Sequence, residues 1–144
     1  MRRLLLVLVL LFSAPFAALA EAPVGPDDRQ AIERVIRDQL AAFGRNDGKA
    51  AFGHASSAIQ GMFRTPDNFM RMVREGYPAI YHSRTAQFLL PQPGESGLGE
   101  PRIVQPVLVE GTDGQGVVAL YYMQRLPDGT WRIDGCSLAE GQSA

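Results

Sequence analysis

The sequence contains few of the residues that build covalent or metal-bound frameworks. It has one cysteine, Cys136, and two histidines, His54 and His82, among 144 residues. A single cysteine excludes an internal disulfide, so the fold must be stabilised by packing. The spacing of these three residues matches no metal-binding motif, and we therefore predict neither a metal site nor a cofactor.

Positive charge is sparse and scattered. Lys49 is the only lysine, and the 14 basic residues are set against 15 acidic residues. No basic stripe of the kind that neutralises a run of phosphates is present, so the sequence predicts no nucleic-acid partner. A chain of this length supports one domain with a modest core.

The apolar run near the N-terminus is too short to cross a membrane. Leu4–Phe12 spans nine residues, whereas a membrane helix needs about twenty. Arg2 and Arg3 precede this run, and Ala18–Ala20 supplies the small residues that signal peptidase prefers. We therefore predict a signal peptide over residues 1–20, export by the general secretory route, and a periplasmic or secreted mature protein without a membrane anchor.

The mature chain begins with a predicted flexible leader over 21–27 and an amphipathic helix over 28–43. Asp27 is the expected N-cap of this helix, and Gln30 completes a capping-box pattern. Apolar residues recur at helical spacing and predict one buried face. They are Ile32, Val35, Ile36, Leu40 and Phe43.

Further helix signals follow this first helix. Asp47 is placed to cap a short helix over 49–53. The stretch 56–63 has apolar residues but no clear pattern. Thr65, with a proline after it, is a strong helix start, and Gly76 is the expected end.

The second half of the sequence has the character of strands. Asp-Gly turns between alternating apolar runs indicate antiparallel hairpins, and the hairpin turn at 127–129 suggests a central last strand. Helices followed by three or four antiparallel strands predict an α+β fold, a single domain over 28–140 with helices on one face of a curved sheet. The expected strands cover 80–90, 103–110, 117–125 and 130–138, with a loop rich in proline and glycine over 91–101.

Three separated segments carry a family resemblance. They are AAFGRNDGKAAFGHAS, MFRTPDNFMRMVREGYPAIY and DGTWRIDGC. In this order they resemble a bacterial domain-of-unknown-function family, numbered 4864, of the nuclear-transport-factor-2-like superfamily. The resemblance covers about residues 28–138 and implies a cystatin-like cone, in which a curved sheet wraps round a long helix. It implies no activity, since the family carries no assigned catalytic residues.

Two interpretations of Cys136 are possible: it is a functional thiol or a small core residue. Trp131 and Ile133 share one strand face, and Cys136 nominally lies on the other, unless a bulge at Gly135 returns it. No histidine lies close in the chain to lower the pKa of the thiol. We therefore predict that Cys136 is buried beside Trp131 and the first helix and is inert, with a ligand-facing thiol as the alternative.

The tyrosines are the most informative aromatic residues, because a buried hydroxyl usually finds a partner. Tyr121 and Tyr122 are adjacent, so one should line the concave face of the sheet and the other the convex face. His82, placed in the first predicted strand, is the histidine that would point into the cone. The ligand-pocket candidates are Tyr77, Tyr81, His82, Tyr121, Tyr122, Trp131, Asp134 and Cys136.

These features favour an exported, non-catalytic binding or interaction module that holds a small apolar or amphipathic ligand in the cone. A homodimer formed through an open sheet face is a further expectation. The alternative is an enzyme resembling ketosteroid isomerases or polyketide cyclases, which would need a pocket carboxylate near a tyrosine. Asp134 is the acid placed within a strand, whereas the others are explained by caps and turns. No catalytic residue is assigned.

Overall fold

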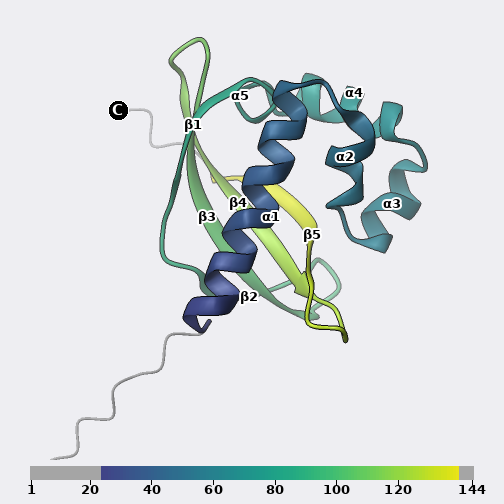
Figure 1. The fold of residues 1–144 in the computed structure, drawn as a ribbon, viewed down its shortest axis with the longest axis vertical. Helices are drawn as coiled ribbons and strands as arrows, with labels where there is room; N and C mark the ends of the chain where they lie inside the picture. The colour runs from purple at the N-terminus through teal and green to yellow at the C-terminus, as the bar shows by residue number, and fades with distance from the viewer. Residues whose placement is uncertain (1–23, 140–144) are drawn as a thin grey trace, which may run out of the picture.

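The chain forms five helices and then five strands within residues 24–139, the part that the computed structural model describes (Figure 1). The helices are α1 Pro26–Gly44, α2 Gly48–Gly53, α3 Ser57–Phe63, α4 Pro66–Gly76 and α5 Pro78–Tyr81. The strands are β1 Ser83–Phe88, β2 Gln92–Glu95, β3 Pro101–Gly111, β4 Gly116–Arg125 and β5 Trp131–Leu138. This order confirms the predicted α+β class. The predicted signal peptide over 1–20 lies outside the described residues. Within them, no helix is long and apolar enough to cross a membrane.

The strands form one antiparallel sheet in the order β1-β3-β4-β5, and β1 and β2 pair with opposite ends of β3. The predicted three or four strands are therefore too few, because β2 forms within the expected loop over 91–101. Gly94 allows this pairing. A Cβ atom at Gly94 would lie 2.4 Å from a methyl carbon of Val104 on β3, so a larger residue would push β2 away.

β5 lies at the edge of the sheet, and the predicted central position is wrong. A hairpin fixes only one neighbour of a strand, and no later strand follows β5 in the described residues. The free edge of β5 is partly covered by the segment between α2 and α3. The Ser56 N–H donates to the Ile133 carbonyl (2.8 Å), and the Ile133 N–H donates to the His54 carbonyl (2.9 Å). These bonds satisfy edge groups that would otherwise stay open.

The start of α1 differs from the prediction. Gly25 is the N-cap and no side chain caps the helix. Pro26 begins the helix because its fixed φ suits the first helical position, so Asp27 lies inside the first turn and the predicted capping box with Gln30 is wrong. Asp28 has another role, since its carboxylate accepts a hydrogen bond from Trp131 Nε1 (3.1 Å) on β5.

The next three helices are capped by side chains. Asp47 accepts a hydrogen bond from the Ala50 N–H and Thr65 from the Asn68 N–H, which confirms both predicted caps. The stretch 56–63 is helical as well, because Ser56 caps α3 in the same way.

Residues 78–81 form a helical turn where a strand was predicted to begin at residue 80. Pro78 occupies the first position of α5, and the Tyr77 carbonyl accepts bonds from the N–H groups of Ile80 and Tyr81. The proline signal for a helix start outweighs the β-propensity of the two residues. As a result β1 begins at Ser83, and Tyr81 is buried.

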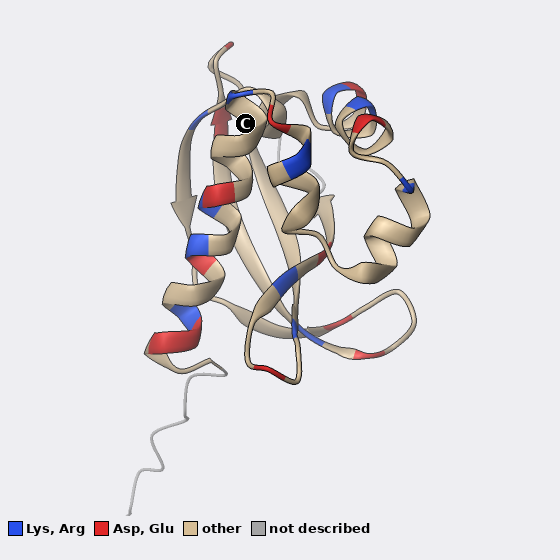
Figure 2. Cartoon of the chain, turned by 45° about the vertical axis from the view of Figure 1, so that its right-hand side comes forward, with Lys and Arg blue, Asp and Glu red and all other residues tan. Residues whose placement is uncertain are grey.

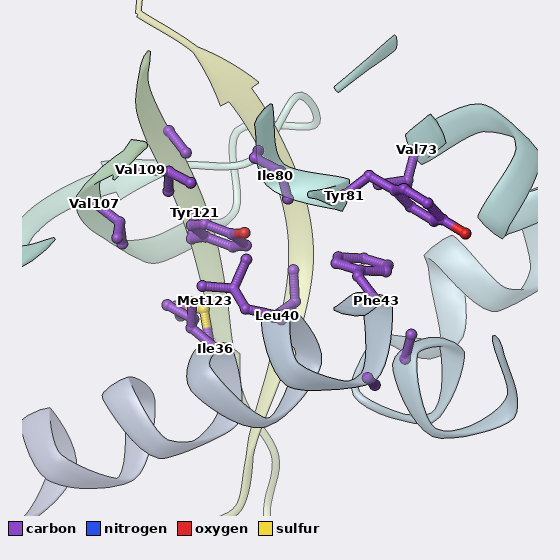
Figure 3. Close-up of a cluster of buried hydrophobic side chains, with 14 of the residues drawn as sticks. Ile36, Leu40, Phe43, Val73, Ile80, Tyr81, Val107, Val109, Tyr121 and Met123 are labelled. Carbon is purple, nitrogen blue, oxygen red and sulfur yellow. The ribbon is translucent and has the colours of Figure 1, made fainter. Parts of the chain in front are cut away.

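α1 crosses one face of the sheet, which we call the inner face (Figure 1). Charged residues mark α1 along its length, and basic residues are dispersed over several elements (Figure 2). In Figure 3 the apolar side of α1 meets the inner face of β3 and β4. The residues in this contact include Ile36, Leu40, Val107, Val109, Tyr121 and Met123. No described helix covers the outer face of the sheet.

Candidate functional site

An apolar cavity of about 200 Å³ lies between helices α3 to α5, the C-terminal part of α1, and the inner face of β4 and β5. None of the described residues that line it is Asp, Glu, Lys, Arg or His. The lining residues are Gln39, Phe43, Ala55, Ile59, Met62, Phe63, Phe69, Met72, Val73, Tyr77, Ile80, Tyr121, Ile133, Gly135 and Cys136.

A bulge in β5 shapes the floor of the cavity. Met123 pairs with Ile133 and Tyr122 pairs with Gly135, so Asp134 is an extra residue without a partner on β4. After the bulge, Cys136 pairs with Tyr121 on the inner face. The sequence left open whether a bulge at Gly135 returns Cys136 to the face of Ile133, and the register shows a bulge there with Asp134 as its extra residue.

Three polar side chains reach the cavity, and two of them donate a hydrogen bond to a backbone carbonyl oxygen of the protein. The Tyr77 hydroxyl donates to the Cys136 carbonyl oxygen (3.1 Å). The Gln39 Nε2 donates to the Ala51 carbonyl oxygen (3.1 Å). The Tyr121 side chain is 1% exposed, and its hydroxyl has no hydrogen-bond partner among the described residues. In Figure 3 this hydroxyl is directed to the side where Phe43 lies.

Cys136 completes this wall with its thiol. The side chain is partly exposed and contributes to the cavity lining. Burial raises the pKa of the Cys136 thiol to about 12, so it is a neutral group at physiological pH. Its neighbours differ from those predicted, because Trp131 lies at the other end of β5, where it contacts Asp28.

α3 is the least buried of the helices that line the cavity. It contributes Ile59, Met62 and Phe63 to the lining, yet none of its residues is fully buried, and Met62 is 69% exposed. The Gln60 amide ties the helix to the preceding segment, since Nε2 donates to the carbonyl oxygens of Phe52 and Ala55 (both 3.1 Å). This wall therefore rests on few contacts and borders solvent.

A family model matches residues 26–144 and is described as a domain of unknown function, DUF4864. The chain belongs to this family. Comparisons with curated proteins and with solved structures found no match.

In this DUF4864 domain, Asp134 does not line the cavity. Its Oδ1 accepts a hydrogen bond from Ser56 Oγ (2.6 Å) and its Oδ2 from Arg102 Nε (2.8 Å). The side chains of Asp134 and Arg102 are each 9% exposed, so the ion pair is largely withdrawn from water. The carboxylate joins the start of α3 to β3 and β5, which is a structural role.

The remaining candidates also lie outside the cavity of the DUF4864 domain. The buried Tyr81 hydroxyl donates to Asn46 Oδ1 (2.6 Å), which ties α5 to the turn after α1. His82 is exposed, so its predicted direction into the cone is wrong; it follows a helical turn instead of lying in a strand. The Tyr122 hydroxyl lies 3.3 Å from Ser137 Oγ on the outer face. Of the eight candidates, Tyr77, Tyr121 and Cys136 line the cavity.

Sequence reasoning missed most of the cavity wall. The ligand-pocket candidates named from the sequence did not include Phe63, Phe69, Met72 or Val73. The structure places all four around the cavity. The available signal was the excess of aromatic and thioether side chains on two short helices, which have little sheet surface to cover. Within the described residues, no group of three or more His, Cys, Asp or Glu could hold a metal ion.

Proposed function

We propose that this chain is an exported, non-catalytic binding module of the nuclear-transport-factor-2-like superfamily, and that it holds a small apolar or amphipathic ligand. The apolar cavity carries this proposal. Ligand sites in proteins are typically concave, mostly apolar and equipped with a few polar groups, and this cavity has that composition. The helices gathered on one face of a curved antiparallel sheet support the superfamily assignment, together with the three segments that resemble the family.

The volume of the cavity limits the size of the ligand. About 200 Å³ is slightly more than an engineered apolar cavity of about 150 Å³ that accommodates benzene, and less than the roughly 300–1,000 Å³ of drug-sized sites. The ligand is therefore about the size of one substituted ring or a short chain. A longer chain would have to extend past α3, where Met62 lines the cavity and is 69% exposed.

Native mass spectrometry tests the proposal directly. We expect the purified protein to carry a bound small molecule that organic extraction removes, and the extracted protein to bind small apolar probes. Met72→Trp fills the cavity from α4 and should abolish probe binding. The matched control is Leu98→Trp, because Leu98 is 89% exposed in the loop between β2 and β3. Equal probe binding by both variants and the wild type would exclude the cavity as the site.

Export from the cytoplasm is part of the proposal and rests on the N-terminal sequence. The mature protein should begin at Glu21 and be recovered from the periplasmic fraction or the medium. N-terminal sequencing of the protein from fractionated cells decides this. A chain that keeps Met1 and stays in the cytoplasm would contradict export.

The alternative function, an isomerase or cyclase, is less well supported by the geometry. It needs a carboxylate within hydrogen-bond reach of a tyrosine inside the cavity. The described lining contains Tyr77 and Tyr121 but no acid, and Asp134 is engaged by Arg102 and Ser56. Binding without catalysis therefore fits the cavity better.

Self-association through the outer face of the sheet is a second proposal. Val104 pairs with Tyr122 and Leu108 with Val118 on this face, and Leu108 is 40% exposed. Partly exposed apolar side chains on a sheet face that no described helix covers favour a protein contact. Light scattering should show a dimer for the wild type and a monomer for Leu108→Lys, whereas Leu98→Lys should stay dimeric. A monomeric wild type would exclude this proposal.

A further inference from the structure

The Tyr121 hydroxyl is the polar group of the cavity that remains without a partner. It belongs to a side chain that is 1% exposed, and no described residue accepts or donates a hydrogen bond to it. Buried hydroxyl groups are almost always hydrogen-bonded in native proteins, because an unpaired one loses its bond to water without compensation. An unpaired hydroxyl at the wall of a cavity therefore points to a partner that occupies the cavity.

The other polar side chains of the wall already donate hydrogen bonds within the protein. Tyr77 donates its hydroxyl to the Cys136 carbonyl oxygen, and Gln39 donates its amide to the Ala51 carbonyl oxygen. The Cys136 thiol is a weak donor. Tyr121 is consequently the lining residue whose hydroxyl makes no hydrogen bond within the described protein and is free to donate to a ligand.

The absence of charged side chains from the described lining excludes ionic ligands. No described lining residue carries a charged side chain at neutral pH, since burial also raises the pKa values of Tyr77, Tyr121 and Cys136 and keeps them neutral. A carboxylate, phosphate or ammonium group would lose its hydration and gain no counter-charge. A neutral oxygen meets no such penalty.

The apolar part of the wall indicates where the body of the ligand lies. Phe69 contacts Phe63 (ring centroids 5.8 Å apart) and Phe43 (6.1 Å). The Met62 and Met72 thioethers lie in the same wall. Aromatic rings and thioethers pack well against a flat apolar ring.

From these observations we propose that the cavity selects a neutral molecule with one hydrogen-bond-accepting oxygen, a carbonyl compound or an alcohol. The Tyr121 hydroxyl donates to this oxygen, and the apolar remainder packs against α3 and α4. This inference rests on the proposed binding function and adds the chemical class of the ligand and the residue that orients it.

Three probes of similar size test separately whether the ligand needs an accepting oxygen and whether it must be neutral. Acetophenone has a carbonyl oxygen, 2-phenylpropene has a CH₂ group in its place, and benzoate has a charge. Binding is measured by calorimetry or by chemical-shift titration with the wild type, Tyr121→Phe and Tyr122→Phe. Tyr122 is the matched control because it lies on the outer face.

We expect Tyr121→Phe to weaken acetophenone binding about fivefold to tenfold, the range of one hydrogen bond, and to leave 2-phenylpropene binding unchanged or stronger. Tyr122→Phe should change neither, and benzoate should not bind. In the wild type and in Tyr122→Phe, but not in Tyr121→Phe, the infrared carbonyl stretch of bound acetophenone should shift to lower frequency, because a hydrogen bond to the oxygen weakens the C=O bond.

The possible failures are distinguishable. If neither neutral probe binds the wild type, the binding function and this inference both fail. If both probes bind but Tyr121→Phe affects them equally, or the carbonyl stretch does not shift, the inference about Tyr121 fails and the binding function stands. Benzoate binding as tight as that of acetophenone would overturn the neutral class.

Discussion

Cys136 lies directly opposite Tyr121 in the β4–β5 ladder, and both residues line the apolar cavity. The pairing depends on Asp134, the extra residue of the bulge. Without it, strand alternation would place the Cys136 side chain on the outer face of the sheet. One residue without a partner on β4 therefore decides that the thiol belongs to the cavity.

The Cys136 thiol should be unreactive in the folded protein. Its pKa is raised to about 12 by burial from an ordinary value of 9.0. Since the thiolate is the reactive form, the folded protein at pH 8 has roughly a thousand times less of it than the unfolded chain. Stopped-flow labelling with a neutral thiol reagent should be slow without denaturant and fast in urea. Equally fast labelling in both conditions would identify Cys136 as an activated thiol.

Stability should decline at alkaline pH. The pKa values of Cys136, Tyr77 and Tyr121 are all raised in the folded protein. Below about pH 9 these groups keep their protons in both states. As pH rises above 9, the unfolded chain releases protons that the folded protein retains, in the case of Cys136 up to about pH 12, so the free energy of unfolding falls.

Urea unfolding between pH 7 and 11 measures this decline. Cys136→Ala removes one contributing group, so its free energy of unfolding should fall less steeply between pH 9 and 11 than that of the wild type. Parallel curves for the two proteins would mean that the thiol ionises as easily in the folded state as in the unfolded chain.

The Tyr121 hydroxyl should not stabilise the empty protein. An unpaired buried hydroxyl costs about 1 to 3 kcal/mol of desolvation free energy, so Tyr121→Phe should be neutral or stabilising by up to about 1 kcal/mol. Tyr81→Phe is the matched comparison, because it removes the same atom but loses the bond to Asn46. It should cost about 1 kcal/mol. Destabilisation of similar size in both variants would show that Tyr121 has a partner in the empty protein.

Much of the fold could be predicted from the sequence, because local chemistry specifies it. Asp47 and Thr65 mark helix starts by capping, and the Asp-Gly turns fix the β3–β4–β5 meander. The errors have physical causes. Pro78 is compatible with a helix start, although the residues after it have the composition of a strand. β5 lies at the edge because no strand follows it within the described residues.

The cavity could be predicted only in part. Alternation along β4 places either Tyr121 or Tyr122 on the inner face, and the structure selects Tyr121. The ion pair of Asp134 could not be predicted from the sequence, because its partner Arg102 is 32 residues away in the chain. A cavity is the volume that side chains leave unfilled, and periodicity shows which side chains face inward without showing how completely they fill the space.

The Asp134–Arg102 pair should matter for stability and not for ligand binding. Asp134→Asn leaves the buried Arg102 guanidinium without one carboxylate, although Glu100 still contacts it. Breaking a buried pair costs roughly 3 to 5 kcal/mol when no other partner remains, so we expect about 2 to 4 kcal/mol by urea unfolding. Glu110→Gln, which breaks the exposed pair with Arg84, should cost less than about 1 kcal/mol. A loss of acetophenone affinity in folded Asp134→Asn would contradict a purely structural role.

α3 should open more readily than the rest of the cavity wall. None of its residues is fully buried, whereas α4 buries Phe69, Met70 and Val73. Local stability follows buried apolar contact, so hydrogen exchange should show at least about tenfold lower protection in α3 than in α4. Acetophenone should raise the protection of α3 selectively, because a ligand in the cavity adds the contacts that this helix lacks.

Gln60 is the residue that should control this opening. Its amide holds α3 to the Phe52 and Ala55 carbonyl oxygens, so Gln60→Ala should accelerate exchange in α3 and the association and dissociation rates of acetophenone together. Gln87→Ala, at an exposed position on β1, is the control and should change neither. If Gln60→Ala accelerates exchange in α3 but leaves both ligand rates unchanged, the ligand enters the cavity by another path.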